Sequence, residues 1–366
     1  RLLRVLELAG TFFRRELGSS AAAAAKEYLL TIRALDAKTV EAFGLGYAPE
    51  QWEGLRRFLA AQKVSEELAL AAGLIVRRDK GPGSYDRFRG RVMFPIKDGA
   101  GRVVSFGGRV LGPGEPKYLN GPESPVFSKS RTLYNLDQAR PAMRRGGRAL
   151  VVEGYFDVIT LAAHGFSETV APLGTALTAE QVRILKAQAQ DIVLIFDGDQ
   201  AGLRAAHRAL PIFLAEGLAP RVLLLPQGED PDSFVRGKGA AGLEAALKQA
   251  RPLIETVLDQ TVLQGDQTSP EGKSAIVQAA GEVIKAIADP VTRTGYLQRL
   301  AAQLGLPAAA LAARLGLPLY NSPAPSASGQ TGAPARGRAK ARMHDPQAAR
   351  LELALASPEA ARVLAE

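Results

Sequence analysis

The stretch from residue 192 to residue 199 reads IVLIFDGD, five apolar residues followed at once by two aspartates that flank a glycine. A short apolar run that ends in a glycine turn is typical of a strand buried on both faces. Helical spacing of apolar residues follows from Ala201 to about Glu216. We therefore predict a strand over 192–196, a loop that carries Asp197 and Asp199, and a helix after it.

The same order of strand and helix recurs on either side of this stretch. Apolar runs at 149–152 and 221–225 predict two more buried strands, and residues 168–171 predict a weaker one. Thr178 and Gln181 have the spacing of a capping box, which predicts the start of the helix that follows the weak strand. Strands that alternate with helices indicate a parallel sheet with both faces covered.

Carboxylates follow three of these strands. Glu153 follows the first apolar run, Asp197 and Asp199 follow the central one, and Asp230 and Asp232 follow the last. The carboxyl ends of parallel strands share one edge, where ligands bind, and acids gathered there repel one another unless a cation lies among them. Carboxylate oxygens select Mg²⁺ or Mn²⁺, whose sites often also hold substrate phosphates. One Asp-Gly pair alone is more often an ordinary turn, but three acidic clusters favour a metal site.

A basic block precedes the acidic segment. Residues 77–148 contain 16 Lys and Arg against 6 Asp and Glu, a net charge of +10, whereas the whole chain carries +9. Basic groups pair with phosphates and exposed aromatic rings stack on bases, so the block suits nucleic acid. A solvated basic face with its aromatic residues in the core is an equal alternative on composition alone. Within the block, residues 91–96 and 102–106 predict a β-hairpin around a turn at 97–101.

The rest of the chain is mostly helical in its periodicity. Residues 1 to about 75 and residues 252–316 have apolar residues at helical spacing. Residues 321–343 contain no acid and consist largely of Ala, Pro, Ser, Gly and basic residues, a composition typical of a flexible linker. The chain has no cysteine, which excludes disulfides, a thiol nucleophile and cysteine-ligated zinc. No apolar run approaches the roughly 20 residues that cross a bilayer.

Several motifs resemble those of a known family. Glu153-Gly154, the DGD triplet at 197–199 and the DPD triplet at 230–232 resemble the TOPRIM signature of bacterial primases, topoisomerases and some nucleases. The sequences YDRFRGRVMFPI at 85–96 and FGGRVL at 106–111 resemble the segment upstream of TOPRIM in bacterial DNA primases. Further similar stretches are PKYLN at 116–120, FSK at 127–129, LY at 133–134, VEGYFDV at 152–158, LGTA at 173–176, DPV at 289–291 and YL at 296–297. The resemblance covers about residues 1–316.

The resemblance implies an α+β fold whose central α/β TOPRIM subdomain has a parallel sheet. A mixed α/β N-terminal subdomain would precede it and a C-terminal helical bundle would follow it. The expected divisions are a basic α/β subdomain at 1–147, the TOPRIM metal-binding subdomain at 148–250, the bundle at 251–320, a basic linker at 321–345 and the start of a helicase-binding helical region at 346–366.

The resemblance also implies roles for the five acids. In the family, the glutamate that matches Glu153 acts at the catalytic centre as a metal ligand or general base. Asp197 and Asp199 would hold metal ions as further catalytic residues, and Asp230 and Asp232 would complete the metal site.

Seven further residues match family positions. Asp157 matches a family acid, with a structural salt bridge as an equal alternative. For Arg89 and Arg91, structural ion pairs are likewise as plausible as ligand binding. The residues expected to bind nucleic acid or nucleotide are Arg89, Arg91, Arg109, Lys117, Asn120 and Lys129.

The function implied is DNA-templated synthesis of short RNA primers on single-stranded DNA, by metal-dependent nucleotidyl transfer. The cofactor would be Mg²⁺ or Mn²⁺, with no zinc in this part of the protein. The expected partners are a single-stranded DNA template, ribonucleoside triphosphates, a replicative helicase bound through a missing C-terminal domain, and single-strand-binding protein. No membrane is expected, and the protein would be cytoplasmic, bacterial and associated with the nucleoid. We expect a core cut from a longer protein.

Two alternatives stay open on the sequence. One is another TOPRIM enzyme, a topoisomerase or a nuclease. A topoisomerase needs a nucleophilic tyrosine, and the isolated candidates are Tyr296 and Tyr320, neither of which has a supporting motif. The other is a non-catalytic module that binds nucleic acid or helicase, against which the intact acidic clusters argue.

Overall fold

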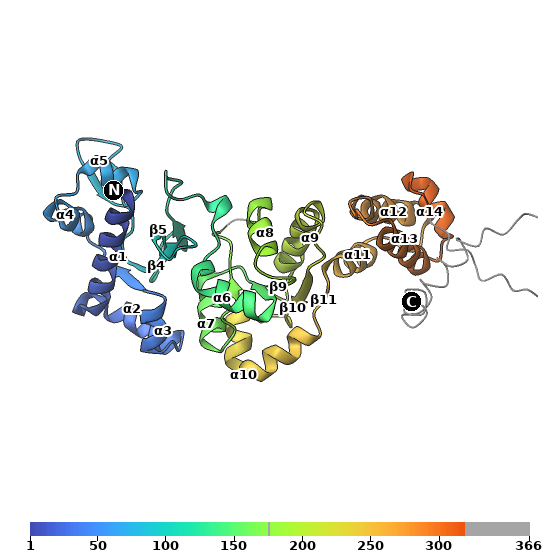
Figure 1. Cartoon of the computed structure of the whole chain (residues 1–366), viewed down its shortest axis with the longest axis horizontal. Coiled ribbons are helices and arrows are strands. Elements are labelled where there is room, and N and C mark those ends of the chain that lie inside the picture. The colour runs from blue at the N-terminus through green and yellow to red at the C-terminus, as the bar shows by residue number, and fades with distance from the viewer. Residues whose placement is uncertain (175, 319–366) are drawn as a thin grey trace, which may run out of the picture. The chain divides into compact units, whose positions relative to one another are not determined.

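The structure is a computed structural model that describes residues 1–174 and 176–318. In Figure 1 the colour runs from the blue N-terminal helices through a green central sheet to the brown and orange C-terminal helices. The predictions for the linker at 321–345, for the region at 346–366 and for Tyr320 lie outside the described residues.

The N-terminal part combines helices with a small antiparallel sheet in the order β1-β4-β5-β6. Its strands are β1 (Gly46–Ala48), β4 (Arg91–Lys97), β5 (Val103–Val110) and β6 (Tyr118–Asn120), and β2 (Ile75–Arg77) pairs separately with β3 (Ser84–Asp86). Its helices are α1 (Leu2–Gly18), α2 (Ala23–Glu27), α3 (Ala37–Ala42), α4 (Gly54–Ala61), α5 (Glu66–Ala71) and α6 (Leu136–Gly146), with short helical turns at Ser20–Ala22, Tyr28–Ile32 and Lys129–Arg131.

The helical pattern of residues 1–75 is interrupted in the sequence at 44–49, and the structure places there a strand, β1, that the sequence did not predict. Gly46 to Ala48 pair antiparallel with Arg91 to Met93 of β4. At Gly46, an added Cβ would lie 2.6 Å from Cβ of Phe13 on α1. Glycine therefore lets the short strand pass directly against α1, and the strand exists because of a partner that is distant in the sequence. The predicted hairpin is confirmed, with β5 longer than expected.

The central part contains the predicted sheet, in the order β11-β10-β9-β7-β8. Strands β7 (Arg148–Val151), β8 (Thr169–Val170), β9 (Asp191–Phe196) and β10 (Arg221–Leu224) pair in parallel, and β11 (Arg251–Pro252) adds an antiparallel edge. The helices between them are α7 (Tyr155–Ala163), α8 (Ala179–Lys186), α9 (Gln200–Ala215) and α10 (Pro231–Lys248).

Alternate residues of these strands enter two different cores, as a period of two requires. Val151 and Phe196 belong to the core that contains side chains of α6, α8 and α9. Val152 and Ile195 belong to the core that contains side chains of α7 and α10. The sheet is therefore covered on both faces, as the apolar runs predicted. The sequence predicts a helix from about Ala240, after the last strand and a polar loop. In the structure this helix begins earlier, at Pro231, and changes direction at Gly239, whose φ is 68°.

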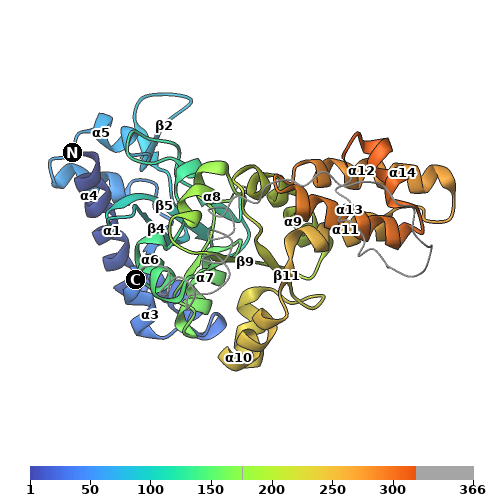
Figure 2. The same ribbon diagram turned by 45° about the vertical axis from the view of Figure 1, so that its right-hand side comes forward.

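Up to residue 318, four helices follow the sheet, and Figure 2 shows them gathered together. They are α11 (Leu253–Gln264), α12 (Pro270–Lys285), α13 (Pro290–Leu304) and α14 (Ala308–Leu315). Ser269 and Asp289 cap α12 and α13 with side-chain hydrogen bonds, and each helix then begins with proline, the residue favoured at the first position. Among the described residues, no helix combines the length and apolar character needed to cross a bilayer.

Candidate active site

The loop after β9 carries two of the predicted acids. Asp197 follows the last residue of the strand, and Asp199 caps α9, its Oδ1 accepting a hydrogen bond of 2.8 Å from the Gly202 amide. At Gly198, an added Cβ would lie 2.1 Å from the carbonyl oxygen of Leu225. Only glycine fits this approach, so the DGD triplet both presents the acids and closes the loop against the end of β10.

The loop after β7 carries Glu153 and leads into α7. Glu153 is exposed, and Asp157 lies in the first turn of the helix. Oδ2 of Asp157 accepts a hydrogen bond of 2.9 Å from the Gly154 amide, which caps the helix. Among the residues that the structure describes, this local bond holds the Asp157 carboxylate and no salt bridge does.

The loop after β10 separates its two acids. Asp230 caps α10 through a hydrogen bond of 2.6 Å from the Ser233 amide to its Oδ1. Asp232 is buried, its exposed fraction being 1%. Its carboxylate pairs with Arg33 and with Arg236, and it accepts a hydrogen bond of 2.8 Å from the Thr160 hydroxyl.

Four of the acids line one cavity of about 290 Å³: Glu153, Asp157, Asp197 and Asp230. The predicted residues Lys117 and Asn120 line it too, together with Arg33. The structure thus brings the ends of three strands to one space, next to polar and basic residues of the N-terminal part. The lining of this cavity does not include the other predicted site residues, which are Asp199, Asp232, Arg89, Arg91, Arg109 and Lys129.

The acids of this cavity act on one another electrostatically. Partial loss of water around the Glu153 carboxylate, with the charges of Asp197 and Asp199, raises its pKa, although Arg208 opposes the shift. Burial, with the charges of Asp230 and Asp199, raises the pKa of Asp197. Burial, with the charges of Asp230 and Asp197, raises the pKa of Asp157 to about 7. Each ionised carboxylate thus makes the ionisation of its neighbours less favourable, and a cation bound among them would offset this repulsion.

The carboxylate oxygens at this cavity fit a hard divalent ion whose coordination shell is completed by substrate phosphates. All the converging donors are carboxylate oxygens, the ligands that Mg²⁺ and Mn²⁺ prefer. Among the described residues, no three acidic or histidine side chains lie close enough together to enclose an ion by themselves. Mg²⁺ commonly takes one or two carboxylates and completes its shell with water and substrate phosphates, so such an open arrangement suits it.

The N-terminal part contributes its side of the cavity through β6 and the segment before it. Asn120 accepts a hydrogen bond of 2.7 Å from the Tyr155 hydroxyl and donates one of 3.0 Å to the Leu173 carbonyl. At Gly107, an added Cβ would lie 2.5 Å from the Tyr155 hydroxyl oxygen, so the glycine makes room for that tyrosine. Lys117 is exposed.

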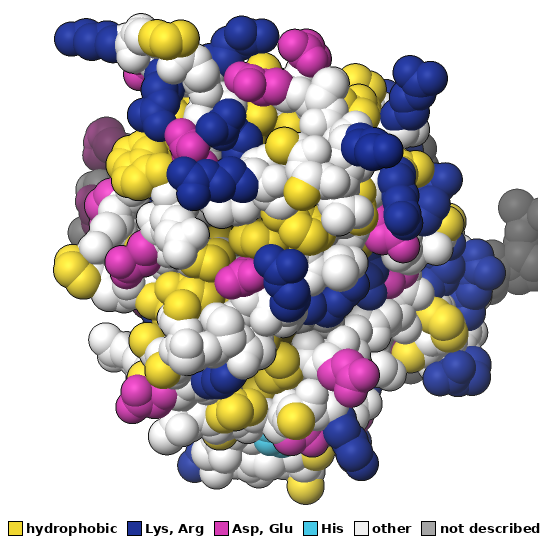
Figure 3. All heavy atoms as spheres, turned by 90° about the vertical axis from the view of Figure 1, so that its left-hand side faces the viewer, with side chains coloured by type: hydrophobic (Ala, Val, Ile, Leu, Met, Phe, Trp, Pro, Cys, Tyr) yellow, Lys and Arg dark blue, Asp and Glu magenta, His cyan; other side chains and the backbone are white. Residues whose placement is uncertain are grey.

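The remaining predicted basic residues have different surroundings. Arg91 is buried and donates to the carbonyls of Gly108 and Pro116, at 3.2 and 2.9 Å. Arg109 lies over the Tyr28 ring, at 4.3 Å from its centroid. Within the described chain, no carboxylate forms an ion pair with the ammonium group of Lys129, which remains free for a ligand. Figure 3 shows Lys and Arg side chains spread over the face of the N-terminal part, with hydrophobic side chains between them.

Arg89 belongs to a partly exposed cluster with Tyr85 and Trp52, and the sequence analysis did not single out Trp52. Its guanidinium lies over the Trp52 ring at 4.1 Å and over the Tyr85 ring at 5.0 Å, and it donates to the Asp86 carbonyl. Trp52 is 54% exposed. A tryptophan that keeps half its surface in water beside an arginine is a suitable platform for base stacking. Single aromatic residues carry little signal in a sequence, which is why Trp52 was missed.

Arg33 was also missed, although it lines the acidic cavity and pairs with Asp232. Its guanidinium lies over the Phe156 ring at 4.4 Å. It comes from the turn before α3, which no motif marks, and its partner lies about two hundred residues later. Tyr296, the described candidate for a topoisomerase nucleophile, packs partly buried against the core that α9 shares with the C-terminal helices, and it does not line the acidic cavity.

Comparison with known proteins is consistent with this geometry. Three family models match the chain: the N-terminal domain of the DNA primase catalytic core over residues 12–140, a Toprim-like domain over 150–235, and the DnaB-helicase binding domain of primase over 257–309. DNA primase of Pseudomonas aeruginosa is 41% identical over 329 residues, which cover 89% of this chain and 49% of that protein. DNA primase of Escherichia coli K12 is 38% identical over 308 residues, which cover 83% of this chain and 53% of that protein. The chain thus spans about half the length of these curated relatives.

Solved structures agree. A DNA primase domain from Pseudomonas aeruginosa has a TM-score of 0.79 at 41% identity, covering 86% of this chain and all of that one. The E. coli primase catalytic core has a TM-score of 0.75 at 38% identity, covering 84% of this chain and 98% of that one. A DnaG primase catalytic domain bound to single-stranded DNA has a TM-score of 0.74 at 37% identity, covering 83% and 96%.

One sequence prediction is corrected by these matches. We placed the helicase contact in a C-terminal domain missing from the chain and begun only at 346–366. The helicase-binding family model instead matches residues 257–309, which form α11 to α13 and lie within the described chain. Their Ala- and Leu-rich composition is that of any packed helix bundle, so it carried no signal of a partner.

The matched families follow one another along the chain in the same order as the parts of the fold. The first two cover the residues that line the acidic cavity, and the third covers helices that follow the sheet. The relatives of known structure share this architecture at more than a third sequence identity. The chain therefore belongs to the bacterial DNA primases, as their catalytic core with its Toprim domain.

Proposed function

We propose that this chain synthesises short RNA primers on single-stranded DNA by metal-dependent nucleotidyl transfer. One observation carries the proposal: carboxylates from three successive strand ends line a cavity whose other side is formed by Lys117, Asn120 and Arg33. Such a cavity offers a negative side for divalent cations and a basic side for phosphates, which is the combination that phosphoryl transfer requires.

Glu153, Asp197 and Asp199 are the residues that we assign to metal binding and catalysis, with Asp230 as a further ligand. A divalent ion bound there would neutralise charge on the transferring phosphate and make a ribose hydroxyl a better nucleophile. Glu153, exposed at the cavity and with its pKa raised, is the residue placed to accept a proton from that hydroxyl. The chain's other contribution is positioning, which supplies much of the rate in reactions of this class.

We do not assign Asp232 to the metal site, although its place in the motif implies that role. Its carboxylate already has two arginine partners and one hydroxyl partner, and it is buried. A carboxylate so engaged would have to lose these contacts to bind an ion. We therefore propose that Asp232 holds Arg33 at the cavity, where the guanidinium lies beside the other acids. The same logic makes Arg91 a structural residue, since its N–H groups bond backbone carbonyls.

The template and the nucleotides are proposed to lie along the basic residues of the N-terminal part. Lys117 and Asn120 would contact them at the cavity, and Lys129, Arg109 and Arg89 away from it. Lys and Arg pair with phosphates of any sequence, so these contacts fix position without reading bases. The solved relative that is bound to single-stranded DNA supports a template of this kind.

The partners and the cell compartment follow from the same assignment. We propose that residues 257–309 contact a replicative helicase, in keeping with the family model that they match. Single-strand-binding protein is a further proposed partner, because it covers the template that a primase must reach. A protein with these partners works in the bacterial cytoplasm at the nucleoid.

The proposal is tested by separating chemistry from template binding. Asp197→Ala and Asp199→Ala should each abolish ribonucleotide incorporation on single-stranded DNA while leaving the affinity for that DNA nearly unchanged. The reason is that an aspartate can bind a cation but only repels template phosphate. Asp191→Asn is the matched control, because Asp191 lies at the opposite end of the same strand, paired with Arg221. Normal incorporation by both alanine variants would refute the assignment.

A further inference from the structure

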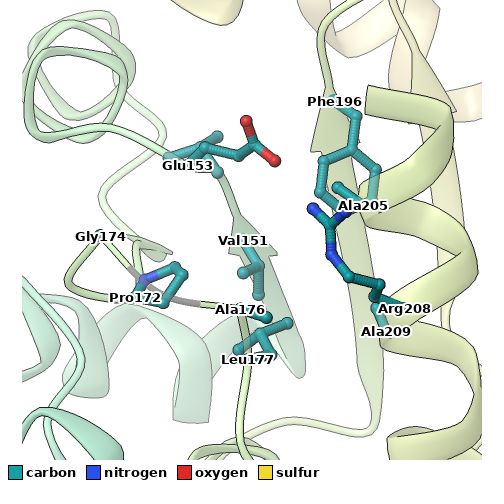
Figure 4. A pocket seen from close by; sticks show the side chains of 11 residues that line it. Val151, Glu153, Pro172, Gly174, Ala176, Leu177, Phe196, Ala205, Arg208 and Ala209 are labelled. Atoms are coloured by element: carbon teal, nitrogen blue, oxygen red, sulfur yellow. The ribbon is translucent and has the colours of Figure 1, made fainter. Parts of the chain in front are cut away.

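A second cavity, of about 370 Å³, lies on the other side of Glu153. It is bounded by the segment around Pro172 and Gly174 and by α9, and Figure 4 shows it from close by. Its walls are mostly apolar, formed by Val151, Leu177, Phe196, Ala205 and Ala209. The volume lies within the range of cavities that bind small ligands.

Two charged side chains line this cavity, Glu153 and Arg208. In Figure 4 the Glu153 carboxylate and the Arg208 guanidinium are both directed into the space between β7 and α9. No ion pair joins them, and no acceptor among the described residues lies within hydrogen-bond distance of the Arg208 guanidinium. Arg208 thus lies at a mostly apolar cavity with its donors unused by the described residues, and its side chain is exposed.

A carboxylate and a guanidinium that face one cavity without pairing suit a ligand that carries both a cation and an anion. A phosphate with its bound divalent cation has this character, the cation being drawn to the carboxylate and the phosphate oxygens to the guanidinium. Arginine offers a planar fork of N–H donors that matches phosphate oxygens two at a time. Apolar walls of the kind seen here accommodate a base or a ribose.

We propose that Arg208 binds a phosphate group of a nucleoside triphosphate, and that the cavity which it shares with Glu153 holds part of that nucleotide. The inference deepens the proposed function and rests on it for the identity of the ligand. It assigns to α9 a role in the nucleotide site beyond the capping of its first turn by Asp199. A single nucleotide is favoured over the template strand because most of the side chains that line the cavity are apolar, and Arg208 is the one basic residue among them.

The test compares Arg208→Ala and Arg208→Lys with Arg204→Ala. Arg204 lies one turn earlier on α9, is exposed like Arg208, and does not line the cavity, so it is a matched control for the loss of one charge. Three quantities are measured: the Kd for a non-hydrolysable nucleoside triphosphate with Mg²⁺, the KM for ribonucleotides in unprimed synthesis, and the Kd for single-stranded DNA. Melting curves confirm that each variant is folded.

We expect Arg208→Ala to raise the nucleotide Kd and the KM about ten- to a hundredfold, the loss typical of a hydrogen bond to a charged group. Arg208→Lys should restore part of the affinity, because it keeps the charge without the fork. Arg204→Ala should match the wild type, and single-stranded DNA should bind all variants equally.

Three results would overturn the inference. The first is a nucleotide Kd of Arg208→Ala that equals that of the wild type. The second is an increase in the nucleotide Kd that is the same for Arg208→Ala and Arg204→Ala. A loss confined to single-stranded DNA would assign Arg208 to the template instead. Failure of the proposed function is seen separately, as absent synthesis by the wild type. In that case the nucleotide analogue can still be tested for binding to the wild type. If its binding is weakened by Arg208→Ala, Arg208 binds the phosphate even though the chain does not synthesise RNA.

Discussion

Asp157 gives the sharpest test of how the acids of the cavity affect folding. Burial, with the charges of Asp230, Asp197 and Asp232, raises its pKa from an ordinary value of 3.8 to about 7, and the hydrogen bond from Gly154 only partly opposes this. The folded protein therefore holds a proton on Asp157 between about pH 4 and pH 7, where the unfolded chain has lost it. Stability contributed by this group is full at low pH and falls as the pH rises towards 7.

The magnitude follows from the two pKa values. Each pH unit between them is worth about 1.4 kcal/mol, so between pH 5 and pH 7 the ionisation of Asp157 lowers the free energy of unfolding by about 3 kcal/mol. Asp157→Asn removes this cost, and the amide oxygen can still accept the hydrogen bond from the Gly154 amide. The variant should thus gain stability over the wild type as the pH rises, and the gain should level off above pH 7.

The assay is urea unfolding of both proteins at pH 5, 6, 7 and 8 in buffer with a chelator. Asp36→Asn is the control, because Asp36 is an exposed helix cap whose pKa is lowered by its hydrogen bond with Thr39, so it is ionised throughout this range. Mg²⁺ should stabilise the wild type at pH 8 more than the Asp157 variant. A difference in unfolding free energy that is the same at pH 5 and pH 8 would refute the reasoning.

Three further predictions concern packing and template binding. Gly107→Ala should lower the free energy of unfolding by about 1–3 kcal/mol, because the added Cβ would lie 2.5 Å from the Tyr155 hydroxyl oxygen. Gly18→Ala is the control, because Gly18 has open space around it, and its stability should not change. Thermal melting of both variants checks this. Trp52→Ala should weaken binding of single-stranded DNA of any sequence about tenfold, whereas Trp52→Phe should keep most of the affinity. Titration by fluorescence anisotropy measures both. If both variants bind as tightly as the wild type, bases do not stack on this ring. Lys117→Ala and Lys129→Ala should each flatten the plot of log affinity against log salt by about 0.7, and an unchanged slope would mean that the lysine contacts no phosphate.

Much of the central sheet could be predicted because its signals are local. The apolar runs around 192–196 and 149–152 identify buried strands, and the capping box of Thr178 and Gln181 marks the start of α8, which begins at Ala179. Parallel topology then brings the strand ends together, so the meeting of Glu153, Asp197 and Asp230 at one cavity follows from the order of the elements.

The features that were missed depend on partners far along the chain. Gly46 to Ala48 form a strand only because β4 pairs with them, and three residues have no periodicity of their own. Asp232 resembles Asp230 in the sequence, yet Arg33 and Arg236 engage it in the fold. The start of α10 at Pro231 did have a local signal, since an aspartate followed by proline is a common helix start, and the periodicity beyond Gly239 obscured it.

The central claim is that the cavity formed by Glu153, Asp197 and Asp230 supports template-directed RNA synthesis with a divalent cation. The most direct measurement is incorporation of labelled ribonucleotides by the wild-type chain on single-stranded DNA without a primer, with products separated by size. The account predicts short RNA oligomers complementary to the template, which are formed with Mg²⁺ or Mn²⁺ and disappear when a chelator is added or the template is omitted. Relaxation or cleavage of DNA under these conditions without RNA synthesis, or synthesis that persists in the chelator, would contradict it.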